Sequence, residues 1–246
     1  MRIHIIACRI FSRELSYLAS QSENQIDITW VARGLHNTPQ ELSRYLQATV
    51  EGIHEQVEKG ILENKPDAIV LGYGLCANGV VGIRCRDIPI VVPRTDDCIA
   101  LFLGSQKRYM EEFGRAGGAC WLNSGWIEHS LQLFDSEDIR RRKWQEYAEK
   151  FGEDNADYLI EMESGWISHY STLGYIHSSV YDPAAYRNRA QSEAESHGWQ
   201  LKEMQDDLRL LKMMVEGNWN DEEFLILKSG ECIAADYTGK KLKAKA

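Results

Sequence analysis

The sequence predicts an α/β protein whose sheet is mainly parallel and doubly wound, in the Rossmann-like manner. Short apolar runs alternate with amphipathic helical segments along the chain, as they do in βαβ units. The runs at 3–7 and 68–71 are apolar almost throughout, which is typical of strands covered on both faces. With 246 residues, 43% of them hydrophobic, the chain can form one domain over 1–235 or two β/α halves, 1–117 and 118–235, that share a cleft.

The first four elements are expected to be strand, helix, strand and helix. The strand at 3–7 is followed by a helix over 13–19, for which Ser12 is the expected N-cap. Alternating apolar and polar residues predict the second strand at 26–31. A threonine cap, a first-turn proline and a capping-box glutamate then predict a helix over 38–57.

The later elements continue this alternation. We expect strands at 68–71, 88–92, 120–122, 175–181 and 224–227, and helices at 99–113, 135–151, 155–170, 184–196 and 201–215. The lysine-rich sequence KKLKAK predicts that residues 236–246 form a flexible basic tail.

Composition bears on partners and location. The formal net charge of −9 argues against a nucleic-acid surface, which is normally basic. No apolar run approaches the roughly 20 residues that cross a bilayer, and the N-terminus lacks the apolar core of a signal peptide. Six cysteines without a tight framework suit a reducing compartment. We therefore expect a cytoplasmic protein with no membrane or nucleic-acid partner.

Three cysteines follow three predicted strands. Cys8, Cys76 and Cys98 each fall one to six residues beyond the expected end of a strand. Because ligands of open parallel sheets bind outside the carboxyl ends of the strands, all three are expected on one ligand-binding edge. We call these residues the three-cysteine site.

Three thiolates in one place repel one another unless a cation or cluster neutralises them. Zinc would take three cysteines and one exchangeable ligand, and a four-iron cluster held by three cysteines would leave one iron open. A redox or nucleophilic thiol site and simple packing remain alternatives, because no C-x-x-C pair is present. Helix N-termini after the loops are expected to lower the pKa values of these thiols.

The loops around the cysteines add further candidates. The loop GYGLCANGVVG contains four glycines, which are expected to allow positive φ angles and close approach of a cofactor. It lacks the G-K-[ST] ending of a P-loop. Gly74, Asn78 and Gly79 are therefore the candidates for cofactor binding.

The segment PRTDDC supplies charged candidates. Arg94 is a candidate cation for a substrate carboxylate or phosphate. Asp97 is a candidate catalytic acid or base, although Asp96 and Asp97 are also typical helix caps.

An aromatic and a histidine follow the fourth strand. Trp126 is a candidate cofactor contact, and His129 a candidate ligand or acid/base, with a satisfied structural histidine as the commoner alternative. The sequence SGWIEH at 124–129 is echoed by SGWISH at 164–169, either by chance or as a duplicated element of the cleft.

Several motifs together resemble one known family. The N-terminal IIAC, the loop YGLCANGVVG, PRTDDCIALFLGS, WLNSGWI and GWQLKEMQDDLRLLKMMVEGNW are similar to the bacterial and archaeal family of domain of unknown function 1638. The resemblance covers about the first 230 residues and emphasises Cys8, Cys76, Cys98, Gly79, Arg94, Asp97, Gly125 and Trp126. It implies an association with corrinoid-dependent methyltransferase systems of anaerobes, and hence with one-carbon or methyl-thiol chemistry.

Two classes of function follow. In the first, an iron–sulfur cluster or zinc at the three-cysteine site acts on a small-molecule substrate, as in a metal-dependent transferase or lyase. In the second, the chain is a non-catalytic accessory or binding module for a corrinoid protein or methyltransferase.

Overall fold

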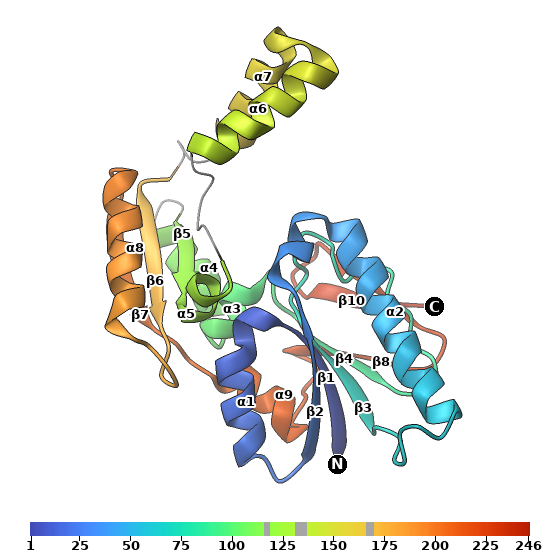
Figure 1. Cartoon of the computed structure of the whole chain (residues 1–246). Coiled ribbons are helices and arrows are strands. Elements are labelled where there is room, and N and C mark those ends of the chain that lie inside the picture. The colour runs from blue at the N-terminus through green and yellow to red at the C-terminus, as the bar shows by residue number, and fades with distance from the viewer. Residues whose placement is uncertain (116–118, 131–136, 166–169) are drawn as a thin grey trace. The chain divides into compact units, whose positions relative to one another are not determined.

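The computed structural model contains a five-stranded sheet, a three-stranded sheet and a two-stranded hairpin, with helices between the strands (Figure 1). It describes residues 1–115, 119–130, 137–165 and 170–246. The strands are β1 (Arg2–Cys8), β2 (Gln25–Val31), β3 (Ala68–Gly72), β4 (Ile90–Pro93), β5 (Cys120–Asn123), β6 (Thr172–His177), β7 (Gln200–Gln205), β8 (Phe224–Leu227), β9 (Cys232–Asp236) and β10 (Lys241–Lys245).

The helices of the described chain are mostly those expected. They are η1 (Arg9–Phe11), α1 (Ser12–Gln21), η2 (Arg33–Asn37), α2 (Pro39–Glu58), α3 (Cys98–Phe102), α4 (Gln106–Arg115), α5 (Ser124–Glu128), α6 (Glu137–Phe151), α7 (Glu153–Ser164), α8 (Ala184–Ser196) and α9 (Arg209–Glu216). The predicted helix end at glycines 117 and 118 lies outside the described residues. None of the described helices is both long and apolar enough to span a bilayer.

The chain divides into two compact units. Unit 1 contains Met1–Met110, Ser179–Tyr181 and Gln205–Ala246, and unit 2 contains Glu111–Ser178 and Asp182–Met204. The division falls near the boundary expected between the two halves, but the chain returns to unit 1 after residue 204. A cleft shared by the halves stays a prediction.

The five-stranded sheet of unit 1 has the order β2-β1-β3-β4-β8. Strands β2, β1, β3 and β4 are parallel, and β8 pairs antiparallel with β4. Helices α1 and α9 lie on one face of the sheet and α2 lies on the other (Figure 1). The predicted doubly wound, mainly parallel α/β fold is therefore confirmed.

The core of unit 1 is built on β1. Ile3, Ile5 and Ile6 in this strand are fully buried, as expected for a strand covered on both faces. The rings of Phe11 and Phe102 stack with their centroids 4.6 Å apart. This contact joins η1, which begins directly after Cys8, to α3, which begins at Cys98.

The predicted helix over 99–113 is two helices, α3 and α4. Gly104 interrupts it with a φ of 69°, a left-handed conformation that favours glycine. A Cβ at this position would lie 2.6 Å from the side chain of Asp207. The break therefore combines a backbone turn with close packing.

Unit 2 contains the sheet β5-β6-β7, in which β5 and β6 are parallel. Its core includes Leu122, Leu173 and Tyr175, with α8 packed against β6. A Cβ on Gly174 would lie 2.2 Å from the indole of Trp121, so the tryptophan lies directly against the glycine backbone.

Two predictions for the later chain are wrong. The helix expected at 201–215 is strand β7 followed by helix α9. Residues Gln200–Gln205 lack a continuous apolar face, and Asp206 and Asp207 separate them from the helix.

The expected flexible tail is also wrong, because its lysines belong to an antiparallel hairpin of β9 and β10. In KLKAK the lysines alternate with Leu242, which is fully buried, so the pattern is that of a strand with one buried face. Lys241 Nζ also lies 2.9 Å from Asp96 Oδ1, which ties the hairpin to the loop before α3.

The approach of β1 to β3 can be tested by substitution of Gly72. A Cβ on Gly72 would lie 2.6 Å from the Cβ of Ala7, its register partner on β1. We expect Gly72→Ala to lower the free energy of unfolding by about 1–3 kcal/mol, because overpacking forces the strands apart. The measurement is denaturant unfolding followed by circular dichroism.

Gly52→Ala is the matched control for Gly72→Ala, because Gly52 lies in α2 with no atom within 4 Å of its would-be Cβ. This substitution should raise stability by about 1 kcal/mol through helix propensity. Equal effects of the two substitutions would contradict the close approach.

Candidate functional site

The three cysteines lie at the carboxyl edge of the sheet in unit 1. Cys8 is the last residue of β1, Cys76 lies in the loop after β3, and Cys98 is the first residue of α3, after β4. Strand β3 lies between β1 and β4, and the three strands are parallel. The thiols therefore follow the same ends of three neighbouring strands.

The hydroxyl of Tyr73 lies near all three thiols. Burial raises the pKa of this hydroxyl, and electrostatic interactions with Cys8, Cys76 and Cys98 raise it further. Tyr73 is only 4% exposed, and its hydroxyl has no hydrogen-bond partner among the described residues. An unpaired buried hydroxyl costs about 1–3 kcal/mol. It marks a position where a bound group would supply the missing contact.

Two of the thiols are held in the protonated form. Burial raises the pKa of Cys8, and it raises the pKa of Cys76 to about 12, with repulsion from Asp97 as a further cause. The backbone N–H groups of Arg9 and Ile10, at the start of η1, lower the pKa of Cys8 as expected of a helix N-terminus, but removal from water raises that pKa by more. Both residues are uncharged near neutral pH unless a cation compensates the thiolate charge.

Sequence reasoning missed Arg33 and Tyr73. Arg33 lies in η2, just after β2, and its guanidinium interacts electrostatically with Cys8 and Cys98. This interaction lowers the pKa of Cys8, although burial raises it by more. Its position in the sequence could have indicated Arg33 as a site residue, because Arg33 follows strand β2 just as each cysteine follows a strand of the same sheet.

The loop that carries Cys76 has a strained backbone. Cys76, Ala77 and Asn78 have φ angles of 45°, 53° and 70°, so three successive non-glycine residues are left-handed. This conformation costs about 1–2 kcal/mol for a residue such as Cys76 or Ala77 and less for asparagine, whose short polar side chain tolerates it. A backbone hydrogen bond of 2.8 Å from Cys76 N to Asp96 O helps to hold the loop in place. Strain of this kind is concentrated at functional sites.

Two glycines of the same loop, Gly74 and Gly79, lie where neighbouring atoms leave no room for a side chain. Among the four glycines of the loop only Gly82 has a positive φ, of 88°, so the backbone freedom that glycine allows is used at one of the four. A Cβ on Gly74 would lie 2.6 Å from Thr95 Oγ1, and one on Gly79 would lie 2.7 Å from Leu42 Cδ2. Cofactor binding by the loop, through Gly74, Asn78 and Gly79, stays a prediction.

Asp97 is the N-cap of α3. Its Oδ1 accepts hydrogen bonds from the backbone of Ile99 at 2.8 Å and of Ala100 at 3.4 Å, and its Oδ2 accepts one from the Tyr109 hydroxyl at 3.3 Å. Burial raises the pKa of Asp97. The capping role is confirmed, and a catalytic role stays a prediction.

Arg94 joins distant parts of unit 1. Its Nε donates to the backbone oxygens of Asp221 at 3.0 Å and Phe224 at 3.1 Å, and its Nη2 donates to Asp221 Oδ1 at 3.1 Å. Its Nη1 donates to the backbone oxygen of Leu242. We therefore assign Arg94 a structural role at the ends of β4, β8 and β10, and substrate binding by it stays a prediction.

In the part of the chain that the structure describes, no group of three or more His, Cys, Asp or Glu side chains is placed to hold a metal ion. The three-cysteine site fits a thiophilic metal in its chemistry, because thiolates are the ligands that such metals prefer. The side chains of Cys8, Cys76 and Cys98 would have to turn toward a common point before they could share a ligand.

Trp126 and His129 belong to unit 2. Trp126 packs against the apolar core of that unit, and its backbone N–H donates to Asn123 Oδ1 at 2.8 Å. His129 is half-buried at the end of α5. Their predicted cofactor and catalytic roles stay predictions, and most of the echoed segment 164–169 lies outside the described residues.

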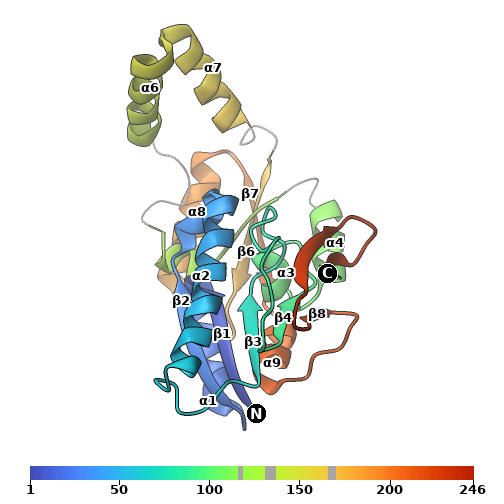
Figure 2. The ribbon, with the colours of Figure 1, turned by 90° about the vertical axis from the view of Figure 1, so that its right-hand side faces the viewer.

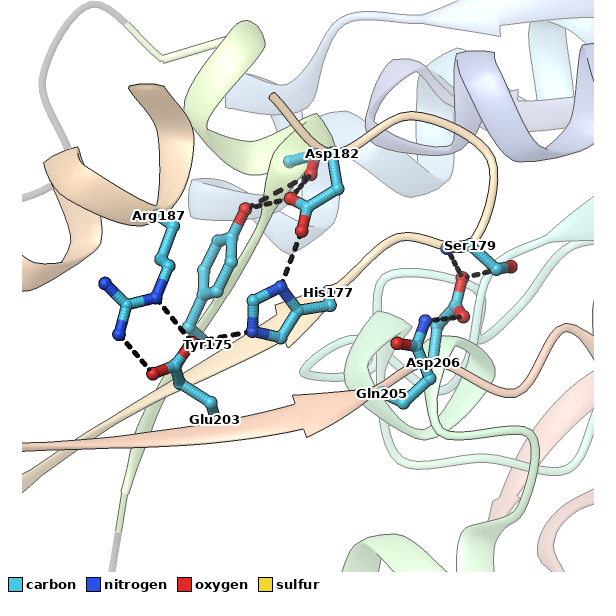
Figure 3. A network of polar contacts seen from close by, with 9 residues as sticks. Tyr175, His177, Ser179, Asp182, Arg187, Glu203, Gln205 and Asp206 are labelled. Carbon is cyan, nitrogen blue, oxygen red and sulfur yellow. Dashed lines mark hydrogen bonds and ion pairs between the residues drawn. The ribbon is translucent and has the colours of Figure 1, made fainter. Parts of the chain in front are cut away.

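Unit 2 contains a polar network that sequence reasoning did not find (Figure 3). Asp182 accepts hydrogen bonds from the hydroxyls of Ser124, at 3.0 Å, and Tyr175. Its other oxygen lies 2.5 Å from Nδ1 of His177. The sequence offers little indication of this network. His177 is simply the last residue of β6, and Asp182 precedes a proline, as an ordinary turn residue would.

The network continues from His177 to Glu203 and Arg187. His177 Nε2 lies 2.7 Å from Oε2 of Glu203, and Oε1 of Glu203 pairs with Arg187 Nη2 at 2.6 Å. Burial alone would lower the pKa of His177, but the hydrogen bonds to the two carboxylates outweigh it and raise that pKa. When His177 is protonated, the imidazolium and the guanidinium balance the charges of the two carboxylates.

Figure 3 also shows Asp206 of unit 1, which accepts hydrogen bonds from the backbone and hydroxyl of Ser179 at 2.9 and 3.1 Å. These bonds fix the short segment around Ser179 that belongs to unit 1.

Strain in the Cys76 loop predicts that Ala77→Gly raises the free energy of unfolding, by about 1 kcal/mol, because glycine adopts a φ of 53° without penalty. Ala48→Gly in α2 is the matched control and should instead lower stability by about 1 kcal/mol. Chemical denaturation measures both, and destabilisation by Ala77→Gly would contradict the strained conformation.

The raised pKa of His177 predicts a pH-dependent contribution to stability. Because the folded pKa lies above the unfolded one, the stabilisation is complete below the unfolded pKa of about 6.5 and is lost as the pH rises through the folded pKa. His177→Gln should therefore destabilise the protein more near about pH 6 than near about pH 9.

The companion variants for His177 are Glu203→Gln and Glu195→Gln, of which only the first removes a partner of the histidine. Thermal unfolding should show a weaker pH dependence for Glu203→Gln than for Glu195→Gln. An effect of His177→Gln that is the same at both pH values would contradict the charged network.

Comparison with known proteins gives a family match. The family described as "Protein of unknown function (DUF1638)" matches residues 30–215, which is more than half of the chain. Cys76 and Cys98 lie within the matched residues, and Cys8 lies before them. No curated protein and no solved structure matches the chain. The chain belongs to the DUF1638 family.

Proposed function

We propose that unit 1 binds a thiophilic metal, as zinc or an iron–sulfur cluster, through the three-cysteine site. The strand order carries this proposal. In the order β2-β1-β3-β4 the chain changes direction between β1 and β3, and Cys8 and Cys76 follow these two strands. Open α/β sheets bind their ligands in the crevice at such a switch point.

The protonation of the thiols supports a metal over a reactive cysteine. A nucleophilic or redox cysteine normally has a lowered pKa, whereas the pKa values of Cys8 and Cys76 are raised by burial. A metal ion would displace these protons and bind the thiolates. Metal affinity should therefore increase as the pH rises.

Three thiolates would leave one coordination position for a substrate, at which zinc or iron would act as a Lewis acid. Tyr73, whose raised pKa keeps its proton in place, would donate a hydrogen bond to a thiolate or to the substrate. Arg33 would offset part of the negative charge near Cys8 and Cys98. We propose a transferase or lyase reaction on a small molecule, in the one-carbon or methyl-thiol chemistry that the family resemblance implies.

The accessory-module alternative shares this metal site and differs in turnover. A module that delivers a metal or corrinoid to a methyltransferase would bind the metal without converting a substrate. Metal binding therefore tests what the two alternatives share, and a turnover assay separates them.

The decisive measurement is the metal and sulfide content of protein purified without oxygen. We expect about one zinc or one cluster per chain, because a three-thiolate site supplies one centre. Cys8→Ser, Cys76→Ser and Cys98→Ser should each lower the content at least about tenfold, since removal of one thiolate weakens the centre.

Cys232→Ser is the matched control, because Cys232 is also half-buried in unit 1 but lies in β9, outside the site. This variant should keep the metal. Protein that neither contains metal nor takes up added zinc or iron with sulfide would refute the proposal, and so would full occupancy in Cys76→Ser.

A further inference from the structure

Two cationic side chains of unit 2 hold the carboxylate of Glu203 in the way that proteins hold a carboxylate ligand. Arg187 donates from Nη2 to Oε1 at 2.6 Å and from Nε to Oε2 at 2.8 Å, and His177 Nε2 lies 2.7 Å from the same Oε2 (Figure 3). Two parallel bonds from a guanidinium form the fork by which arginine recognises planar carboxylates. The donors come from β6 and α8, whereas Glu203 lies on β7.

The imidazole of His177 is positioned by groups other than Glu203. Asp182 Oδ2 lies 2.5 Å from Nδ1 of His177, and Asp182 itself accepts hydrogen bonds from the hydroxyls of Ser124 and Tyr175. The Tyr175 ring meets the imidazole edge-on, with 4.8 Å between the ring centroids. Asp182 therefore fixes the ring through Nδ1 and leaves Nε2 for contact with another group.

The arrangement lies at an end of the sheet where ligands are expected. Strands β5 and β6 are parallel, and His177 is the last residue of β6. Helix α8, which carries Arg187, packs against β6 (Figure 2). Ligands of open α/β sheets bind outside the carboxyl ends of parallel strands. The side chains of His177, Glu203 and Arg187 are 26%, 33% and 44% exposed, so a solute can reach them.

Contact of an anion with Nε2 depends on the protonated form of His177. An imidazole donates from both nitrogens only as the cation, because the neutral ring carries one N–H. The other described partners of Asp182 are neutral hydroxyls, whereas Glu203 keeps the cation of Arg187. The neutral ring therefore directs its N–H to Asp182 and presents a lone pair to Glu203, which repels the carboxylate.

The charged groups around the His177 ring are Asp182 from the loop after β6, Glu203 from β7 and, beyond Glu203, Arg187 from α8. Burial lowers the pKa of His177, but its hydrogen bonds to the two carboxylates outweigh burial and raise that pKa. Burial raises the pKa of Tyr175, so its hydroxyl stays neutral. Anion binding should therefore weaken as the pH rises through the pKa of His177.

Glu203 is the member of this arrangement that a ligand can replace. It lies on β7, a terminal strand in the order β5-β6-β7. The hydrogen bonds of its carboxylate within the described chain go to His177 and Arg187. Partly exposed ion pairs contribute little net free energy. A ligand carboxylate that adds contacts of its own would therefore displace Glu203 at small cost.

We propose that His177 and Arg187 form a binding site for the carboxylate group of a small molecule, and that Glu203 occupies this site until such a ligand displaces it. The guanidinium then contacts both oxygens of the ligand carboxylate, and the imidazolium contacts one of them. The site belongs to unit 2, so the proposal holds whether or not the three-cysteine site binds metal.

Titration of the full chain with sodium acetate, followed by NMR of the His177 imidazole, tests this proposal. At about pH 6, where His177 is protonated, acetate should shift the His177 resonances saturably. Glu203→Gln should raise the affinity at least about tenfold, because a site that is open for a fraction of the time binds more weakly by that fraction. Glu195→Gln, which changes an acid of α8 outside the network, should bind acetate as the wild type does. His177→Gln assigns the resonances, and sodium chloride at the same ionic strength is the control for screening.

Arginine variants test the fork. In the Glu203→Gln background, Arg187→Gln should abolish saturable binding, whereas Arg189→Gln should preserve it, because residues two positions apart do not share a face of a helix. Thermal unfolding checks that the variants fold. The wild type supplies a test without substitution, since its affinity for acetate should be lower at about pH 9 than at about pH 6.

Four results would overturn the proposal. The first is the absence of a saturable shift in both the wild type and Glu203→Gln, and the second is the same shift with chloride. The third is equal affinity of the wild type and Glu203→Gln, because Glu203 would then not occupy the site. The fourth is binding that survives Arg187→Gln or that is the same at both pH values.

Discussion

The close parallel pairing of β1 with β3 is the constraint on which the candidate site depends. Ala7 and Gly72 are register partners, and the contact between them leaves no space for a Cβ on the glycine. This approach places Cys8 and the Cys76 loop on either side of the point where the order of strands reverses. Strand β4 then brings Cys98 to the same edge by pairing with β3. Side chains far apart in the sequence are thus gathered by backbone pairing before any of them contacts a ligand.

Three unfavourable features occur together at this edge. The thiols of Cys8 and Cys76 are removed from water, the Tyr73 hydroxyl lacks a partner among the described residues, and the backbone of 76–78 is left-handed. The unpaired hydroxyl and the left-handed residues each cost about 1 kcal/mol or more, and burial disfavours the thiolate forms of the two cysteines. A fold tolerates such costs in one place when the place serves a function. A bound cation would relieve the first two, because it stabilises thiolates and gives the hydroxyl charged neighbours to which it can donate.

The sequence predicted the strands of unit 1 well because they are buried on both faces, which makes them continuously apolar. It failed at 200–205 and 241–245, where partly exposed strands carry lysines and glutamates that are equally typical of helices or tails. The three cysteines could be assigned to one edge of the sheet, since the sequence shows that each follows a predicted strand. Tyr73 and Arg33 could not, because their importance depends on which thiols they face. The network of His177, Asp182 and Glu203 joins residues of ordinary type, and only the tertiary fold brings them together.

Arg94 connects the end of β4 to backbone oxygens near β8 and β10, which lie far later in the chain. Unit 2 is encoded between these parts. During translation, β4 therefore leaves the ribosome well before its antiparallel neighbour β8 and the acceptors of its arginine. For that interval the nascent sheet ends in an open strand, which is a template for wrong pairing. The time needed to synthesise unit 2 sets how long this edge of the sheet stays open.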